Sequence, residues 1–475
     1  MWVKVALGLI YSSPAGPTHK NKKKGRCVGM TKRRKVGVAV IICLVLSLWT
    51  PAALAAEEVA EETPAKLVRI SGPWVSPGEE LDLSMMYQPE QLAEDLQKFE
   101  ELSNGRMELE VLGYSAGYEY PIQVAKFGQR DDSKPKLLID SQIHGNEPLG
   151  TEAIMRLIEA FATSDDPEIE MVLDNVVVWF IPMLNPDGSV IFQTDNNEGD
   201  NQQRQNIQDW TPHEWGLPAD TPAPWYLREA TTRGTPGYDI NRDSHPHLPF
   251  DLARLKGEHS PAVKEQNWGG EPGFFVTPEA RALRDAFLAL EPDAYINHHH
   301  RGNNIVSEED FNRVYLQICA QFVPQGKEYK ITDGGKEYTY SLSEESLDLS
   351  RKINALVYQK LQPEYTLIDK MAKYTDPMSV ISKYRRVDDD NDGAGLPGTT
   401  LGSYSLNGAA VMLYEVSNLG PKMSEPLIRQ SLAGIYETIK GFATGEVYDV
   451  DPNFYEDEIP ECGPAVRSAY YQLAS

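Results

Sequence analysis

The sequence predicts a single α/β domain with a central mixed, mostly parallel twisted sheet flanked by helices. Two apolar runs, residues 137–143 and 176–181, have the length and composition of buried strands. They alternate with segments whose apolar residues recur at helical spacing, a pattern typical of α/β sheets. Residues suited to chemistry come directly after the strands, and in this fold class ligands bind at the carboxyl ends of the strands.

Periodicity and end signals predict the helices in order along the chain. The first helix is marked by its apolar positions, Ala153, Ile154, Leu157, Ile158 and Phe161. The second opens with Thr277 as N-cap and Pro278 in its first turn, and it leads into a strand at residues 293–297. The last follows Ser424 as its cap and has the apolar positions Ile428, Leu432, Ile435 and Ile439. Between these elements, the polar residues 194–233 predict a long loop.

The N-terminal region predicts export from the cell. The first 55 residues contain ten Lys or Arg and no Asp or Glu, and they end in an apolar stretch and a small-residue cleavage site. Because a normal signal peptide would begin at Met30, we expect residues 1–29 to be untranslated and residues 30–55 to be the signal peptide. Residues 56–84 are then an extended lead-in, 85–445 the domain and 446–475 a C-terminal tail. We expect a secreted or periplasmic protein.

The charge of the exported chain limits its partners. The 420 residues after the signal peptide carry 35 basic and 70 acidic groups, which changes the net charge from −25 to −35. Such a surface repels nucleic acids and anionic membranes, so we expect neither as a partner, and we expect a monomer. The two cysteines that remain, Cys319 and Cys462, are predicted either to form a disulfide in an oxidising compartment or to be two free thiols.

A metal-binding pattern follows the first predicted strand. His144 and Glu147 lie on one tight turn directly after residues 137–143, so an imidazole nitrogen and a carboxylate can reach a single cation. Imidazole and carboxylate ligands suit Zn²⁺, and a catalytic zinc site keeps one position open for water, whose pKa falls toward about 7. The pattern supplies two of the three protein ligands that such a site needs.

Further segments in the same order give a family resemblance. The chain resembles the zinc carboxypeptidases of the pancreatic carboxypeptidase type, which are metallocarboxypeptidases of peptidase family M14. The resemblance covers about residues 85–445 and implies the fold of that family. It is carried by five segments: residues 144–150, 185–188, 237–243, 297–302 and 411–415.

The resemblance implies one zinc ion per chain, held by His144, Glu147 and His299. Side chains alternate between the two faces of a strand, so the middle one of the three consecutive histidines and its two neighbours lie on opposite faces, and only one of these faces is turned to the crevice. With His299 as the ligand, His298 and His300 point away, and we expect them to be packed or facing solvent.

The resemblance also assigns the acid–base and substrate-binding groups. Glu415 ends an apolar strand and corresponds to the general base that activates water and then protonates the leaving amine. The alternative is a structural carboxylate. Asn241 and Arg242 correspond to the pair that holds the free C-terminal carboxylate of the peptide, which the planar guanidinium can grip through two hydrogen bonds. The alternative for Arg242 is an ion pair with Asp239 or Asp243.

Two further family residues are harder to locate. The family uses an arginine, upstream of the Asn-Arg pair, to stabilise the oxyanion, and Arg204, Arg228 and Arg233 compete for this role. We choose Arg233 because it lies just before residues 237–239. A mobile tyrosine of the family is assigned to Tyr404, the nearest candidate.

An acidic run begins like a calcium-binding loop. Asp388, Asp390 and Asp392 have the spacing of Ca²⁺ ligands, but the twelfth position is Thr399 instead of Glu. We therefore favour a solvated acidic loop over a Ca²⁺ site.

The sequence as a whole predicts an exported zinc metallocarboxypeptidase that hydrolyses the C-terminal bond of peptides with a zinc-activated water. One alternative is a zinc amidohydrolase of the same fold that acts on cell-wall peptides or acylated amino acids. Another is a catalytically inactive peptide-binding module, which the presence of both the metal ligands and Glu415 disfavours. The preferred C-terminal side chain is not predicted.

Overall fold

The computed structural model describes residues 86–190, 202–255, 271–302, 304–305, 313–361, 380–384, 395–417 and 424–463. Contacts divide the chain into Met1–Thr63 and Pro64–Ser475, and every described residue belongs to the second unit. The predicted signal peptide, the lead-in and the acidic run at residues 388–392 lie outside the described residues. Among the helices that the structure describes, none has the length and apolarity needed to cross a membrane.

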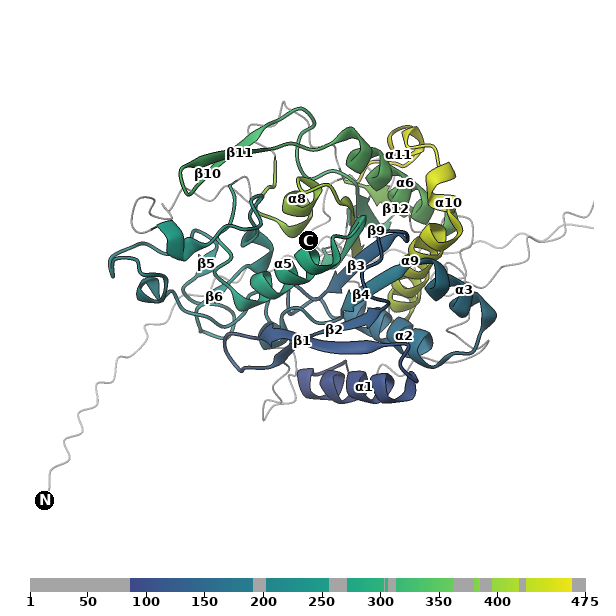
Figure 1. Cartoon of the computed structure of the whole chain (residues 1–475), viewed down its shortest axis with the longest axis horizontal. Helices are drawn as coiled ribbons and strands as arrows, with labels where there is room; N and C mark the ends of the chain where they lie inside the picture. The colour runs from purple at the N-terminus through teal and green to yellow at the C-terminus, as the bar shows by residue number, and fades with distance from the viewer. Residues whose placement is uncertain are drawn as a thin grey trace, which may run out of the picture. The chain divides into compact units, whose positions relative to one another are not determined.

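The described part of the chain is built on a nine-stranded sheet (Figure 1). Its main order is β1-β2-β4-β3-β7-β13-β9-β12, and the short β8 pairs with β9. Strands β4, β3, β7 and β13 run parallel in the centre, and β1 and β2 pair antiparallel with their neighbours. Strand β9 is antiparallel to β13 and β8 and parallel to the edge strand β12. The strands are β1 (Glu108–Tyr114), β2 (Pro121–Phe127), β3 (Lys136–Ser141), β4 (Val177–Ile181), β7 (Ala294–Arg301), β8 (Asn304–Ile305), β9 (Arg313–Cys319), β12 (Val380–Lys383) and β13 (Ala410–Ser417).

Helices cover both faces of this sheet, so its central strands are apolar along most of their length. One face packs against α1 (Pro89–Leu102), α2 (Leu149–Thr163), α3 (Pro167–Asn175), α6 (Glu344–Leu361) and α9 (Ser424–Thr444). The other packs against α5 (Pro278–Leu290), α8 (Thr400–Ser405) and the loops around residues 210–250. The predicted fold class is therefore confirmed.

Smaller elements complete the description. Two hairpins pair β5 (Leu227–Arg228) with β6 (Gly237–Tyr238) and β10 (Tyr329–Asp333) with β11 (Lys336–Tyr340). Short helical turns occur at α4 (Pro186–Ser189), η1 (Pro212–Trp215), η2 (Ile240–Arg242) and η3 (Leu252–Leu255). Near the C-terminal end, α10 (Glu446–Asp449) and α11 (Asn453–Asp457) pack on α9 and α6, although we predicted a tail there.

Local chemistry explains where key helices begin. The side chain of Thr277 accepts a hydrogen bond from the backbone N–H of Ala280 at 3.1 Å, and Pro278 occupies the first turn, as the sequence predicts for α5.

Both Cys319 and Cys462 are free thiols, so of the two outcomes predicted for them the structure has the free form.

Candidate metal centre and active site

The turn between β3 and α2 presents His144 and Glu147 at the carboxyl end of the sheet. The backbone N–H of Glu147 donates to the carbonyl of His144 at 3.1 Å, which closes the turn. Gly145 is required here because a Cβ at this position would lie 2.1 Å from the carbonyl carbon of Gly188. Asn185 fixes the same segment through hydrogen bonds to the carbonyls of Ile143 and Arg204. Close packing of backbone on backbone therefore holds the turn in place.

His299 joins these two residues to form a buried cluster. The ligand atoms of His144, Glu147 and His299 all lie within 4.8 Å of one another. The Nδ1 atoms of His144 and His299 lie 2.8 and 2.9 Å from the two carboxylate oxygens of Glu147 and 3.1 Å from each other. Two imidazole nitrogens and a carboxylate that converge on one point fit Zn²⁺, with a position left for water or substrate.

Strand parity explains which of the three consecutive histidines reaches the cluster. His299 on β7 is in register with Glu415 on the parallel β13, so both side chains lie on the same face of the sheet. His298 and His300 lie on the opposite face. There His298 Nε2 is 2.9 Å from the hydroxyl of Ser431, and His300 Nε2 accepts a hydrogen bond at 3.0 Å from the backbone N–H of Leu149 at the start of α2.

Two polar residues support the histidines from outside the cluster. Asp239 Oδ1 lies 3.3 Å from His144 Nε2, and Asn241 Nδ2 lies 3.3 Å from His299 Nε2. Of the two, the carboxylate of Asp239 can accept the N–H of a ligating imidazole, which orients the ring of His144 and raises its basicity. Burial opposes ionisation of Asp239, but the charges of Arg204 and Arg242 hold the pKa of Asp239 well below its usual range. The carboxylate is therefore ionised beside His144.

Glu415 lies beside the cluster with two partners of its own. The hydroxyl of Tyr384 donates a hydrogen bond to Glu415 Oε2, and Arg301 Nη1 lies 3.9 Å from the same oxygen. Burial raises the pKa of Glu415 to about 7, against the opposing effects of Tyr384 and Arg301. A carboxylate with a pKa near neutrality is suited to accept and return a proton.

Two arginines lie close to the cluster. Arg204 Nη1 is 3.2 Å from His144 Nδ1 and 3.7 Å from Glu147 Oε1, and Arg204 Nε donates to Asp239 at 2.9 Å. Arg242 follows in the turn η2 and donates to the carbonyl of Asn241 at 2.7 Å. The structure thus brings Asn241 and Arg242 to the edge of the metal cluster, as the sequence predicts, together with a second guanidinium.

The structure does not bring Arg233 or Tyr404 to the cluster. The guanidinium of Arg233 donates to the carbonyls of Asp187 and Gly188 at 2.6 and 3.2 Å and to that of Val190, so it braces the α4 turn. The ring of Tyr404 is buried on the α5 side of the sheet, stacked 4.1 Å from the ring of Phe287. The arginine that lies at the cluster is Arg204, and the tyrosine that contacts Glu415 is Tyr384.

Sequence reasoning missed three of the residues now found around the cluster. Asp239 offered a signal, because it lies two residues before Asn241 in a segment that carries the family resemblance. Arg301 lies in another such segment, residues 297–302, but nothing in that segment predicts a contact with Glu415, and Tyr384 belongs to no motif.

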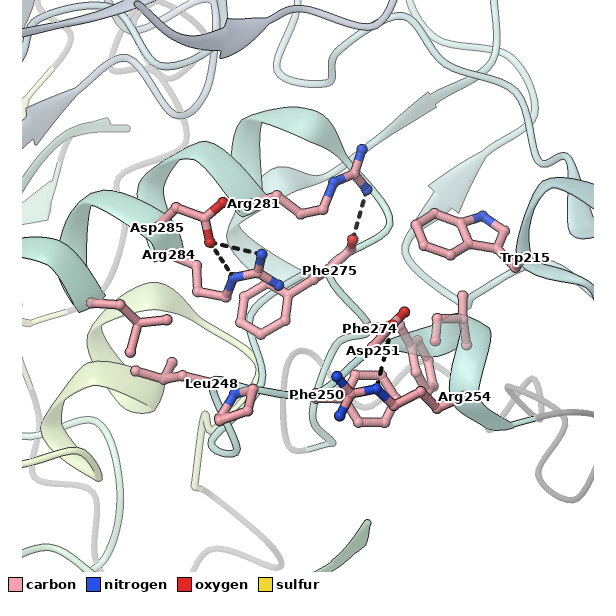
Figure 2. A pocket seen from close by; sticks show the side chains of 13 residues that line it. Trp215, Leu248, Phe250, Asp251, Arg254, Phe274, Phe275, Arg281, Arg284 and Asp285 are labelled. Atoms are coloured by element: carbon pink, nitrogen blue, oxygen red, sulfur yellow. Dashed lines mark hydrogen bonds and ion pairs between the residues drawn. The ribbon is translucent and has the colours of Figure 1, made fainter. Parts of the chain in front are cut away.

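A separate pocket lies between α5 and the loops that precede it. Figure 2 shows Arg281, Arg284 and Asp285 along α5 on one side and Trp215 and Phe250 on the other. The cavity has a volume of about 440 Å³. Neither the metal cluster nor Glu415 lines it, so it is distinct from the candidate active site.

Comparison with known proteins places this geometry in a family. Residues 92–365 match the family model described as zinc carboxypeptidase, Peptidase_M14. The chain belongs to the zinc carboxypeptidase family. The matched region includes His144, Glu147, Asn241, Arg242 and His299 and ends before Glu415, whose position rests on the β7–β13 register.

Individual relatives of this zinc carboxypeptidase family member are distant. The chain is 33% identical over 75 residues to carboxypeptidase E of Caenorhabditis elegans, which is 14% of this chain and 16% of the relative. It is 33% identical over 60 residues, 12% of this chain and 14% of the relative, to a zinc carboxypeptidase of Saccharothrix mutabilis. The matched stretches thus span only about a sixth of these relatives.

Solved structures that match this chain include carboxypeptidase A from Helicoverpa armigera. It is 17% identical, with a TM-score of 0.48, over 77% of this chain and 75% of that chain. A metallo-carboxypeptidase from Burkholderia cenocepacia is 16% identical, with a TM-score of 0.43, over 75% of this chain and 70% of that chain.

Proposed function

We propose that the protein is an exported, zinc-dependent carboxypeptidase that removes the C-terminal residue of peptides. The observation that carries the proposal is the buried convergence of His144, Glu147 and His299 beside a carboxylate, Glu415, with a pKa of about 7. Membership of the zinc carboxypeptidase family supports it. The basic and then apolar N-terminal sequence supports export, and the strongly negative net charge supports a monomer.

The proposed chemistry divides between the metal and the side chains. A zinc ion held by His144, Glu147 and His299 would lower the pKa of a water toward about 7 and polarise the substrate carbonyl. Glu415 accepts a proton from the attacking water and returns it to the departing amine, and the hydrogen bond from Tyr384 holds its carboxylate in place.

Two guanidinium groups have separate tasks in this proposal. Arg204 lies next to His144 and Glu147, so we assign it to the negative charge that develops on the carbonyl oxygen. Arg242 and the amide of Asn241 hold the terminal carboxylate of the peptide, which confines cleavage to the last bond. Asp239 keeps Arg204 oriented through the hydrogen bond at 2.9 Å.

A comparison of blocked peptides tests the proposal. The zinc-loaded protein is incubated with an N-blocked tripeptide as the free acid, the same tripeptide as the C-terminal amide, and an N-acylated amino acid, and the products are identified by mass spectrometry. We expect release of one amino acid from the free acid, little from the amide, and no reaction after chelation of the metal.

The other outcomes separate the alternatives. Equal turnover of acid and amide would refute exopeptidase action, and a strong preference for the acylated amino acid would favour an amidohydrolase. Zinc binding without turnover of any compound would favour an inactive binding module. Arg242→Lys provides a matched control, because it keeps the charge but loses the forked donors.

A further inference from the structure

The guanidinium group of Arg301 lies beside Glu415, and two of its nitrogen atoms form no hydrogen bond within the part of the chain that the structure describes. It is the last residue of β7, and its Nε and Nη1 atoms are buried without a hydrogen-bond partner among the described residues. The 3.9 Å between its Nη1 and Glu415 Oε2 is too long for a hydrogen bond. Its guanidinium carbon lies 4.9 Å from the centre of the Tyr384 ring, a cation–π contact that forms no hydrogen bond.

The other arginines near the crevice differ in this respect. Arg204 donates to the carboxylate of Asp239 at 2.9 Å, and Arg242 donates to the carbonyl of Asn241 at 2.7 Å. Buried polar groups in native proteins are nearly always hydrogen-bonded, and a guanidinium offers five donors. The side chain of Arg301 as a whole is 18% exposed, although its Nε and Nη1 atoms are buried. An unused planar donor beside the catalytic base indicates a binding partner that arrives with the substrate.

The position of Arg301 relates it to the reacting bond. Arg301 and His299 are two residues apart on one strand, so both side chains lie on the same face, about 7 Å apart along the strand. Two residues of an extended peptide cover about the same length. Arg301 is therefore within reach of side chains next to the bond that is cleaved.

The contacts also separate Arg301 from the group that holds the substrate's end. Asn241 contacts His299 at Nε2, on the outer edge of the ring, whereas Arg301 lies beside Glu415 on the neighbouring strand. In the proposed binding mode, the terminal carboxylate of the peptide is held at Asn241 and Arg242. The residues on the N-terminal side of the scissile bond then lie toward Glu415 and Arg301.

We propose that Arg301 binds an acidic side chain on the N-terminal side of the scissile bond, so that peptides with Glu or Asp next to their C-terminal residue are preferred substrates. This inference rests on the proposed function and adds a substrate class to it. The guanidinium would form a forked pair with the side-chain carboxylate of the substrate. Arg301 lies beside Glu415, whereas Arg242 donates to the carbonyl of Asn241, so the proposal assigns the two arginines to two different carboxylates.

A matched peptide series tests this selectivity. The substrates are N-blocked tripeptides with one constant free C-terminal residue and with Glu, Gln or Lys at the position before it, together with a set that carries Glu or Gln as the released residue. We measure kcat/KM at constant ionic strength. Wild type is expected to prefer Glu over Gln at the position before the released residue by about 10- to 100-fold, the range for a hydrogen bond to a charged group.

Three variants identify the group responsible. Arg301→Gln should reduce the Glu-to-Gln ratio to about 1, and Arg301→Lys should give an intermediate ratio because it retains the charge without the fork. Arg301→Glu should reverse the preference toward Lys. The control is Arg284→Gln in the separate pocket, where Arg284 pairs with Asp285 at 2.7 Å (Figure 2), and its ratio should equal that of wild type.

The possible results distinguish a failure of the inference about Arg301 from a failure of the proposed carboxypeptidase function. If the Gln peptides are cleaved but wild type shows no preference for Glu before the released residue, the inference is refuted and the proposed function stands. The same holds if Arg301→Gln lowers the turnover of Glu and Gln peptides equally, because Arg301 then acts only through Glu415. A preference confined to Glu as the released residue would overturn the assigned position. If no free-acid peptide is cleaved, the proposed function fails and the inference with it.

Discussion

Replacing Arg204 and Arg233 separately by Gln discriminates between the arginine that lies beside the metal cluster and the one chosen from the sequence. Arg204 lies next to His144 and Glu147, so Arg204→Gln should remove the donor proposed for the oxyanion. Removing one such donor typically lowers kcat by about 10²- to 10³-fold, equivalent to about 3–4 kcal/mol. Arg204 is 37% exposed, so its ion pair with Asp239 contributes only about 1 kcal/mol or less to stability after solvent screening. The loss of turnover should therefore occur in a folded protein.

Arg233→Gln should have the opposite profile. Its guanidinium donates to the carbonyls of Asp187, Gly188 and Val190, so the substitution should lower the free energy of unfolding by about 1–3 kcal/mol and leave kcat within a few-fold of wild type. The assay combines kcat and KM for a free-acid tripeptide with zinc content and a thermal unfolding curve. If Arg233→Gln loses turnover with zinc and fold intact while Arg204→Gln keeps it, the assignment of Arg204 is refuted.

Four further substitutions test the remaining roles. Glu415→Gln should retain zinc but lower kcat by about 10⁴-fold or more, since one group serves both proton transfers, and loss of zinc would make Glu415 part of the metal site instead. His299→Ala should abolish zinc binding, whereas His298→Ala on the opposite face should retain it; full zinc occupancy in His299→Ala would exclude His299 as a ligand. Tyr384→Phe removes a hydrogen bond that partly offsets the effect of burial, so the pKa of Glu415 should rise above its value of about 7. The acidic limb of the kcat/KM profile should then move to higher pH by about one unit, and an unmoved or downward-shifted limb would contradict this contact.

The sequence alone was sufficient where chemistry depends on local geometry. His144 and Glu147 lie within one turn after a buried strand, so their spacing by itself brings both ligands to one point. The period of a strand likewise separates His299 from His298 and His300. The fold class followed from strands and helices in alternation, because each of these periodicities is a property of a short segment.

Only the tertiary structure decided contacts between segments that are distant along the chain. The region that carries both Arg204 and Arg233 is largely irregular, and the spacing of an irregular segment does not specify which side chain turns toward β3. Tyr384 reaches Glu415 because β12 pairs with β9 and β9 pairs with β13, an order that brings an edge strand next to the crevice. Tyr404 is nearer to Glu415 in sequence but turns into the core against Phe287. The order of strands in a sheet depends on the burial of the whole apolar surface, and no short stretch of sequence specifies it.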